Sequence, residues 1–305
     1  MRHQSFGWLM PMTLVITLVS LLWIPAAGQI PQRPGSPPMA PYGQLAGCSE
    51  EPAQFHRCAL AKAKGFDPPR TPDGKPDFRG FWGRGVARGT DDIEEHGSGL
   101  GDSGGYSQVV DPADGKIPYQ TWAAAKRRDF FANYHDPANI CAQPGVPRQA
   151  YTAGVNQILQ TPDSLIYLNE YAHAYRVIRL DGRPHISPNI RLVMGSSRGH
   201  WVGKTLIVDV TNQIGKTWFD HAGNFFSDAV HVVERWTMFD ANAIHYEATI
   251  DDPKVYTRPW TIVSGLRRNT DAGYELWESA CHEGSINSSR TEIGLKYYFG
   301  VVPPK

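Results

Sequence analysis

Short alternating runs of apolar and polar residues dominate the chain from about Val155 onward. A period of two is typical of β-strands that bury one face, and turn residues separate the runs at close intervals. The pattern predicts an antiparallel meander of eight or nine strands that closes into a lipocalin-like barrel, because closure removes exposed strand edges. A β-sandwich is the alternative. The expected strands read VNQILQT, SLIYLNEY, AYRVIRL, GHWV, TLIVDVT, HVVERWTMFD, AIHYEATI, WTIVSGLRR and YELWESA.

The pattern differs in residues 48–150, which we expect to form an irregular, partly helical region in front of a β-barrel-like domain at 151–305. Apolar residues at helical spacing predict a helix within 119–133. Residues 70–85 read as a turn followed by a short strand. The Gly- and Asp-rich residues 86–118 predict a long surface loop or disorder.

Residues 1–28 carry the pattern of a secretory signal peptide. A basic start precedes an apolar run, and Ala26-Ala27-Gly28 fits the small-residue rule for cleavage before Gln29. An uncleaved anchor is the alternative, because the run is almost long enough to cross a bilayer. After cleavage no transmembrane segment is expected. Residues 29–47 are Pro-rich and predict an extended tether. The chain is therefore expected to be periplasmic or secreted.

The four cysteines of an exported chain predict disulfide bonds, although four cysteines allow three connectivities. We expect Cys48–Cys58, which would clip a short helical piece at 48–66. We also expect Cys141–Cys281, which would tie the entry of the barrel domain to its end. A zinc site is the alternative, but no Cys-x-x-Cys spacing supports it.

The charge balance argues against nucleic acid as a partner, because Lys plus Arg and Asp plus Glu both number 30 and leave no basic excess. Nucleotide-binding motifs are absent in a usable context, so no cofactor is expected. His-x-His and His-Glu-x-x-His spacings are absent as well, so no metal is expected. Nine Trp, thirteen Tyr and twelve Phe instead predict an aromatic interior that suits a small apolar or aromatic molecule.

Alternation also decides which side chains can share the barrel interior. Glu234 and Trp236 share one face of their strand with aliphatic residues, and Tyr246 shares a face with aliphatic residues in the next strand. This aromatic and aliphatic set is expected to line the cavity. A shift of register by one residue would exchange the faces and turn the opposite set inward. That opposite set is His231, Arg235, His245 and Glu247.

The acid–base hypothesis centres on His231, because imidazole gains and loses protons near neutral pH. Glu234 or Asp228, each three residues away, would orient His231. Arg235 or Arg176 would stabilise negative charge that develops on a ligand. A structural role is the alternative for each of these residues.

Further residues are candidate ligand contacts. Tyr246 would position the ligand, and Trp236, His185 and His221 would contact it. An Arg inside a barrel needs a carboxylate partner or an anionic ligand. Glu170 is therefore a candidate partner for Arg176.

Several sequence blocks occur along most of the chain after residue 70: TPDGKPDFRGFW (71–82), CAQPGVPR (141–148), DGRPH (181–185), WVGKTLIVDV (201–210), HVVERW (231–236), DDPKVYTRPW (251–260) and ESAC (278–281). With these blocks the chain resembles a large group of exported bacterial proteins, most of which have no assigned function. The resemblance implies an extracytoplasmic location and a shared β core, and it brings no reaction. The chain departs from the pattern of the group at 220–226, DHAGNFF, which contains His221.

Three classes of function follow from these features. In the first, the barrel binds a small apolar or aromatic molecule and transforms it by cofactor-free acid–base chemistry of the lyase, isomerase or cyclase type. In the second, the same barrel is a non-catalytic ligand carrier. In the third, the chain is an envelope interaction module that makes contacts through its Pro-rich tether and the 86–118 loop. The sequence does not predict an oligomeric state.

Overall fold

The computed structural model describes residues 44–86, 92–97, 105–279, 295–296, 298–301 and 303. The expected signal peptide, nearly all of the tether, and Cys281 lie outside the described residues. The helices are α1 (Pro52–Gly65) and α2 (Thr121–Asn133), with short 3-10 turns at Pro137–Ile140, Arg148–Ala150 and Tyr171–His173. The strands are β1 (Gly80–Val86), β2 (Val109–Asp111), β3 (Asn156–Thr161), β4 (Ser164–Asn169), β5 (Tyr175–Arg179), β6 (Ser196–Val202), β7 (Thr205–Thr211), β8 (His231–Asp240), β9 (Ala243–Asp251) and β10 (Trp260–Arg268).

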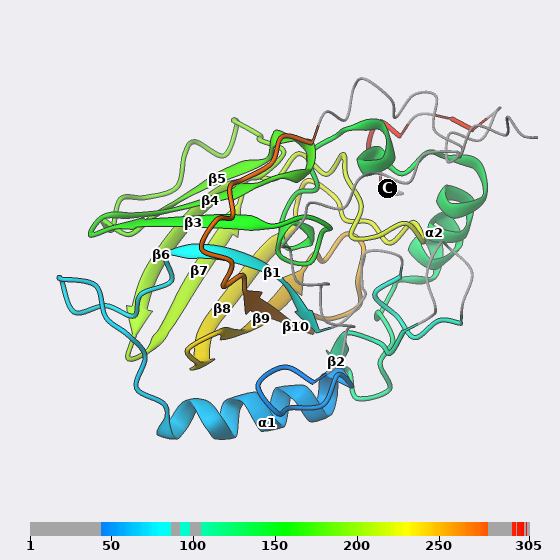
Figure 1. Ribbon diagram of the computed structural model, residues 1–305. Coiled ribbons are helices and arrows are strands. Elements are labelled where there is room, and N and C mark those ends of the chain that lie inside the picture. Colours follow the sequence, from blue (N-terminus) through cyan, green and yellow to red (C-terminus); the bar gives the residue numbers. More distant parts are fainter. Residues whose placement is uncertain are drawn as a thin grey trace, which may run out of the picture. The chain divides into compact units, whose positions relative to one another are not determined.

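The strands close into a nine-stranded barrel, as the alternating pattern predicts (Figure 1). β3 to β10 follow one another around the ring, and β1 closes it by pairing with both β3 and β10. β2 pairs with the remaining part of β10. The barrel is therefore not confined to residues 151–305, because one of its strands comes from the N-terminal region.

Two features of the expected meander are wrong. The pairing of β5 with β6 is parallel, because residues 180–195 cross over to the other end of the barrel before β6 begins. The run YELWESA, which the alternation predicts as the last strand, is irregular over its described residues 274–279. β1 occupies the position beside β10 that a final strand would have taken.

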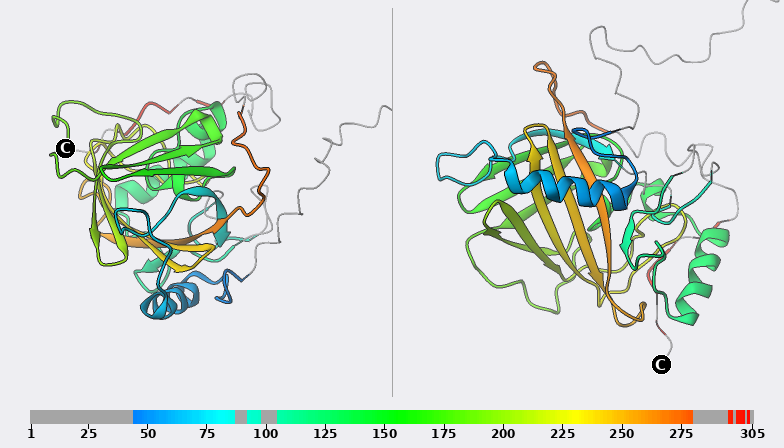
Figure 2. Two further views of the ribbon diagram at one scale, coloured as in Figure 1. Left: turned by 60° about the vertical axis from the view of Figure 1, so that its left-hand side comes forward. Right: turned by 90° about the horizontal axis from the view of Figure 1, so that it is seen from below.

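Helix α1 lies across the outer face of strands β8, β9 and β10 (Figure 2). The Glu51 carboxylate caps its first turn by accepting hydrogen bonds from the amides of Ala53 and Gln54, and Pro52 starts the helix. Phe55 and Ala59, one turn apart, are buried in a second core outside the barrel. A glycine is needed beneath them, because a Cβ at Gly265 would lie 2.9 Å from the Phe55 ring.

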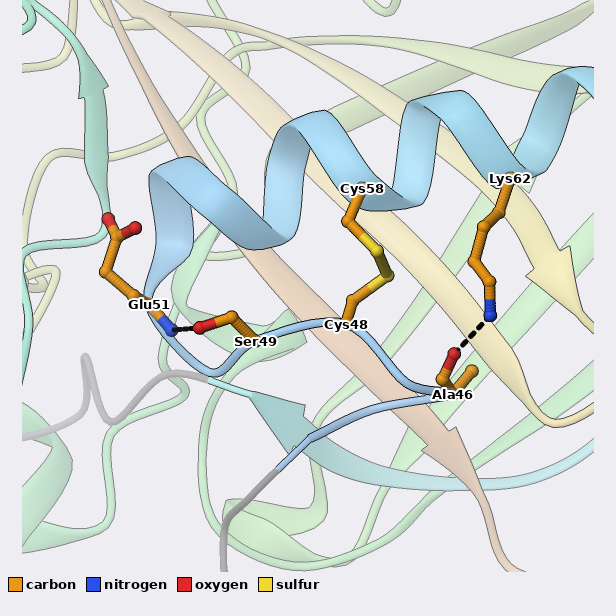
Figure 3. The surroundings of a disulfide bond; sticks show 6 residues. All are labelled: Ala46, Cys48, Ser49, Glu51, Cys58 and Lys62. Carbon is orange, nitrogen blue, oxygen red and sulfur yellow. Dashed lines mark hydrogen bonds between the residues drawn. A yellow bond between two sulfur atoms is a disulfide. The ribbon is translucent and has the colours of Figure 1, made fainter.

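The disulfide Cys48–Cys58 clips the approach to α1, as the sequence predicts (Figure 3). Lys62 adds a hydrogen bond to the carbonyl of Ala46. Leu45, which falls in the predicted tether, is buried in the second core, so the end of the tether is part of the fold. Cys141 is also disulfide-bonded.

Replacing Cys58 with Ser should lower the free energy of unfolding by about 2–3 kcal/mol, because opening a loop of this length increases the conformational entropy of the unfolded chain. Urea-induced unfolding without reductant would measure the loss. The Cys48→Ser/Cys58→Ser double variant should match the single variant. Identical unfolding midpoints for the wild type and the variants would contradict the expected role of the disulfide.

Residues 86–118 are not a surface loop throughout. Ile93, Val109 and Ile117 belong to the main core, and Gln108 is fully buried. Helix α2 confirms the helix expected within 119–133, and its Phe130 packs against Trp218 and Phe225 from the long connection between β7 and β8. In the described part of the chain, no helix has both the length and the apolar character needed to cross a membrane.

Candidate functional site

The barrel interior brings together five side chains from four strands, and we call them the interior cluster. Alternation along β8 turns Glu234 and Trp236 inward, while His231 and Arg235 point outward. All five members of the interior cluster are buried. They are Tyr167 from β4, Arg176 from β5, Glu234 and Trp236 from β8, and Tyr246 from β9.

A bidentate ion pair forms the centre of the interior cluster. Arg176 donates to both carboxylate oxygens of Glu234, with 3.1 Å between Nη1 and Oε1. Tyr246 donates its hydroxyl to Oε1 at 2.7 Å. The side chains of Arg176 and Glu234 are 4% and 0% exposed, so both charges are removed from water. The sequence expectation that Glu170 pairs with Arg176 is wrong: Glu170 accepts hydrogen bonds from Val155, Tyr274 and Trp277 instead.

The surroundings of Arg176 and of the two tyrosines in the interior cluster favour their protonated forms. Burial by itself would lower the pKa of Arg176, but the Glu234 carboxylate outweighs that effect and raises it. Burial raises the pKa of Tyr246 well above its ordinary value, and the charge of Glu234 adds to the rise. Burial also raises the pKa of Tyr167. Both hydroxyls therefore act as hydrogen-bond donors near neutral pH.

Three polar atoms of the interior cluster have no hydrogen-bond partner: Arg176 Nε, the Tyr167 hydroxyl and Trp236 Nε1. Each carries a proton to donate. An unsatisfied buried donor costs about 1–3 kcal/mol. Aromatic rings surround these atoms, since Trp236 makes edge contacts with Tyr167 at 5.4 Å and with Tyr246 at 5.0 Å between ring centroids. The interior thus combines an aromatic wall with unused donors.

A second polar cluster, the Asp136 cluster, consists of Asp136, Arg148 and His221. Asp136 and Arg148 lie in the segment that follows α2, and His221 lies in the connection between β7 and β8. Arg148 donates to both oxygens of Asp136, at 2.9 and 2.7 Å, and both side chains are buried. His221, a predicted ligand contact, binds Asp136 through Nδ1. Tyr151, which follows the 3-10 turn of Arg148, is buried and donates its hydroxyl to the carbonyl of Phe219 at 3.1 Å.

Asp220 is a further buried carboxylate in this region. Burial, followed by the negative charge of Asp92, raises its pKa to about 8. Asp220 accepts hydrogen bonds from the amides of Ile93, Ala222 and Asn224 and from the side chain of Asn224. Its oxygens are occupied by protein groups, so Asp220 joins the residues near 93 to the loop at 220–224.

His185 and His231 lie together on the outer face of the barrel. His185 Nε2 and His231 Nε2 lie 2.8 and 2.7 Å from the two oxygens of Asp209. His185 Nδ1 lies 3.0 Å from the Ser196 hydroxyl. The order resembles a Ser–His–Asp hydrolase triad, but Ser196 is only 4% exposed and offers a substrate little access. This group fixes the β5–β6 connection to the barrel wall.

The catalytic arrangement expected around His231 is therefore not formed. Glu234 lies on the opposite face of β8 and binds Arg176, and Asp228 pairs with Lys254 at the surface. Arg235 is an outer-face residue 3.4 Å from Glu247. Sequence spacing pairs His231 with a carboxylate three residues away. In the structure His231 instead binds Asp209, on the neighbouring strand β7. Alternation marks Tyr167 as an inward residue, but no spacing pattern indicates that Asp136, Arg148 or Asp209 has a buried or paired role.

A third cluster joins α1 to the outer face of β9. His56 Nδ1 lies 3.0 Å from His245 Nε2 and 3.9 Å from Glu247 Oε2. Among the described residues, His56, His245 and Glu247 form the group of potential metal ligands whose donor atoms lie close enough together to hold one ion. Burial, followed by the proximity of His56, lowers the pKa of His245 to about 3.

Comparisons with known proteins leave the function open. No protein-family model matches the chain, and no curated protein matches it. Among solved structures, a mutant of the fluorescent protein UnaG is similar over 38% of this chain and 72% of that chain, with 14% identity and a TM-score of 0.23. So low a score carries no argument about a ligand, and the fold assignment depends on the barrel topology itself.

Proposed function

We propose that the barrel interior binds a small, largely aromatic molecule that carries an acceptor group such as a carboxylate or a carbonyl. The observation that supports this most is the set of unused donors of Arg176, Tyr167 and Trp236. A buried ion pair is a poor source of stability, because the desolvation of both charges offsets their attraction. An ion pair that is surrounded by aromatic rings can bind a polar group on an otherwise apolar ligand.

The proposed function is binding, with turnover left as an outcome of experiment. The two tyrosine hydroxyls keep their protons near neutral pH, and Arg176 is held charged by Glu234. Such groups recognise an acceptor by donating to it. His231, on which the acid–base hypothesis depends, and His185, a predicted ligand contact, both lie on the outer face of the barrel.

An extracytoplasmic location is part of the proposal. The disulfide Cys48–Cys58 supports it, since such bonds persist in oxidising compartments. The signal-peptide pattern of residues 1–28 and the resemblance to exported bacterial proteins point the same way. A carrier in the cell envelope would encounter its ligand without access to cytosolic cofactors.

Two matched probes test the binding proposal: naphthalene-2-carboxylate and the uncharged naphthalene-2-methanol. Trp236 lies in the interior cluster, so quenching of tryptophan fluorescence should report binding. We expect saturable binding of the carboxylate that is at least tenfold tighter than that of the alcohol, because only the carboxylate can accept from all three donors. Native mass spectrometry of the purified protein would show any molecule already bound.

A variant without the buried charges supplies the control. We call Arg176→Met/Glu234→Met/Tyr246→Phe the apolar triple variant. It removes the charge and the Nε donor of Arg176 but keeps the donors of Tyr167 and Trp236, so we expect its preference for the carboxylate to be much smaller than that of the wild type. Arg235→Gln, on the outer face of the same strand as Glu234, should keep the preference of the wild type. Equal binding of the two probes by the wild type would contradict the proposal. So would the absence of both saturable binding and a co-purifying molecule.

A further inference from the structure

We propose that His56, His245 and Glu247 form a binding site for a divalent transition-metal ion of the Zn²⁺ type. The site lies between α1 and the outer face of β9, on the far side of the barrel wall from the interior cluster. It is independent of the proposed ligand-binding function.

The spacing of the donor atoms fits a tetrahedral ion. All three lie within 4.8 Å of one another, and the measured separations from His56 Nδ1 are 3.0 Å to His245 Nε2 and 3.9 Å to Glu247 Oε2. Zinc bonds of about 2.0–2.2 Å to nitrogen and oxygen at tetrahedral angles separate the donor atoms by about 3.3–3.5 Å. Shifts of up to about 1 Å in the donor atoms would bring all three separations to these values.

The chemistry of the three groups also matches zinc, which takes imidazole nitrogen and carboxylate oxygen as ligands. His245 is buried and its Nδ1 has no hydrogen-bond partner. Its Nε2 faces the nitrogen of His56, and without an ion one of these two atoms must carry a proton. A bound ion would use both lone pairs at once.

The surroundings hold the ligands in place. Arg235 Nε lies 3.4 Å from Glu247 Oε1, which fixes the carboxylate and leaves Oε2 facing His56. The disulfide at Cys58, two residues after His56, fixes the helix. The His56 and Glu247 side chains are 26% and 18% exposed, so water can reach the site and complete the coordination. The positive charge of Arg235 opposes that of the ion and sets a limit on affinity.

Such an ion would tie α1 to the barrel wall. Binding of a structural metal ion contributes to the free energy of folding. Here the ion would join two histidines that lie 189 residues apart in the sequence. The inferred role is therefore attachment of the helix, with no reaction assigned to the ion.

The test uses the full chain, purified without a histidine tag and dialysed against EDTA. Zn²⁺ is then titrated in competition with a chromophoric chelator, and Co²⁺ is added separately to record its visible absorption. We expect one ion per chain, cobalt absorption typical of four-coordinate geometry, and a rise of the melting temperature with Zn²⁺.

His56→Asn and Glu247→Gln change the two partly exposed ligands and spare the buried His245. Each should weaken Zn²⁺ binding at least tenfold and abolish the rise of the melting temperature, with unchanged circular dichroism. His200→Asn, at an exposed histidine on β6, should bind Zn²⁺ like the wild type. Absence of stoichiometric binding would overturn the inference. Equal loss of affinity in His200→Asn, or none in His56→Asn, would do the same.

Discussion

Asp136→Asn should lower the free energy of unfolding by about 3–5 kcal/mol, because it leaves the buried charge of Arg148 without a carboxylate. Arg148 and His221 both bind Asp136, and the two members of the ion pair are almost completely excluded from solvent. Asparagine has nearly the same size as aspartate, so the expected loss is electrostatic and not a packing defect.

Asp228→Asn provides the matched control. Asp228 pairs with Lys254 at 2.9 Å, but both side chains are about half exposed, and such surface pairs contribute about 0–1 kcal/mol. Urea-induced unfolding of both variants measures the difference. If the two variants lose the same small amount, the Asp136 cluster is not a stabilising feature of the loops around α2.

The pH dependence of stability should follow from the same cluster. Burial alone would raise the pKa of Asp136, yet Arg148 and His221 outweigh it and hold the pKa below its usual range. In the unfolded chain an aspartate titrates near pH 3.9. A group whose pKa is lower in the folded state contributes its full stability above the unfolded value and loses it as the pH falls. The stability advantage of the wild type over Asp136→Asn should therefore shrink below about pH 4.

The part of the candidate site that sequence could predict is the part that depends on local geometry. Alternation within one strand places Glu234 and Trp236 on the same face, and the same rule places Tyr246 inward. The cap at Glu51 and the helical spacing of Phe55 and Ala59 likewise specify α1 from neighbouring residues.

Partners across the barrel could not be predicted, because they depend on the order and direction of the strands. Arg176 meets Glu234 and not Glu170 because β5 and β8 both face the interior, although 58 residues separate the two side chains. The parallel pairing of β5 with β6 depends on a crossing connection that no alternation reveals. His231 finds Asp209 on the neighbouring strand, whereas its neighbours in sequence point elsewhere.

Glu234→Gln should destabilise the barrel by about 3–5 kcal/mol, because it leaves Arg176 charged and buried without its partner. The apolar triple variant should be at least as stable as the wild type, since replacing a whole buried ion pair with apolar groups of similar volume is often neutral or stabilising by about 1–4 kcal/mol. Tyr246→Phe belongs in it, because the hydroxyl would otherwise lose its acceptor. Urea-induced unfolding of the three proteins measures both effects.

The wild type, Glu234→Gln and the apolar triple variant together distinguish the effect of the ion pair on stability from its effect on ligand recognition. A triple variant that is as stable as the wild type, but has a much smaller preference for naphthalene-2-carboxylate, would mean that the buried charges serve binding at the expense of stability. A triple variant as unstable as Glu234→Gln would contradict this view, because the ion pair would then be needed to hold β5 against the rest of the barrel. In that case the unused donors of Arg176, Tyr167 and Trp236 would be a tolerated cost of closing the barrel around a bulky aromatic core.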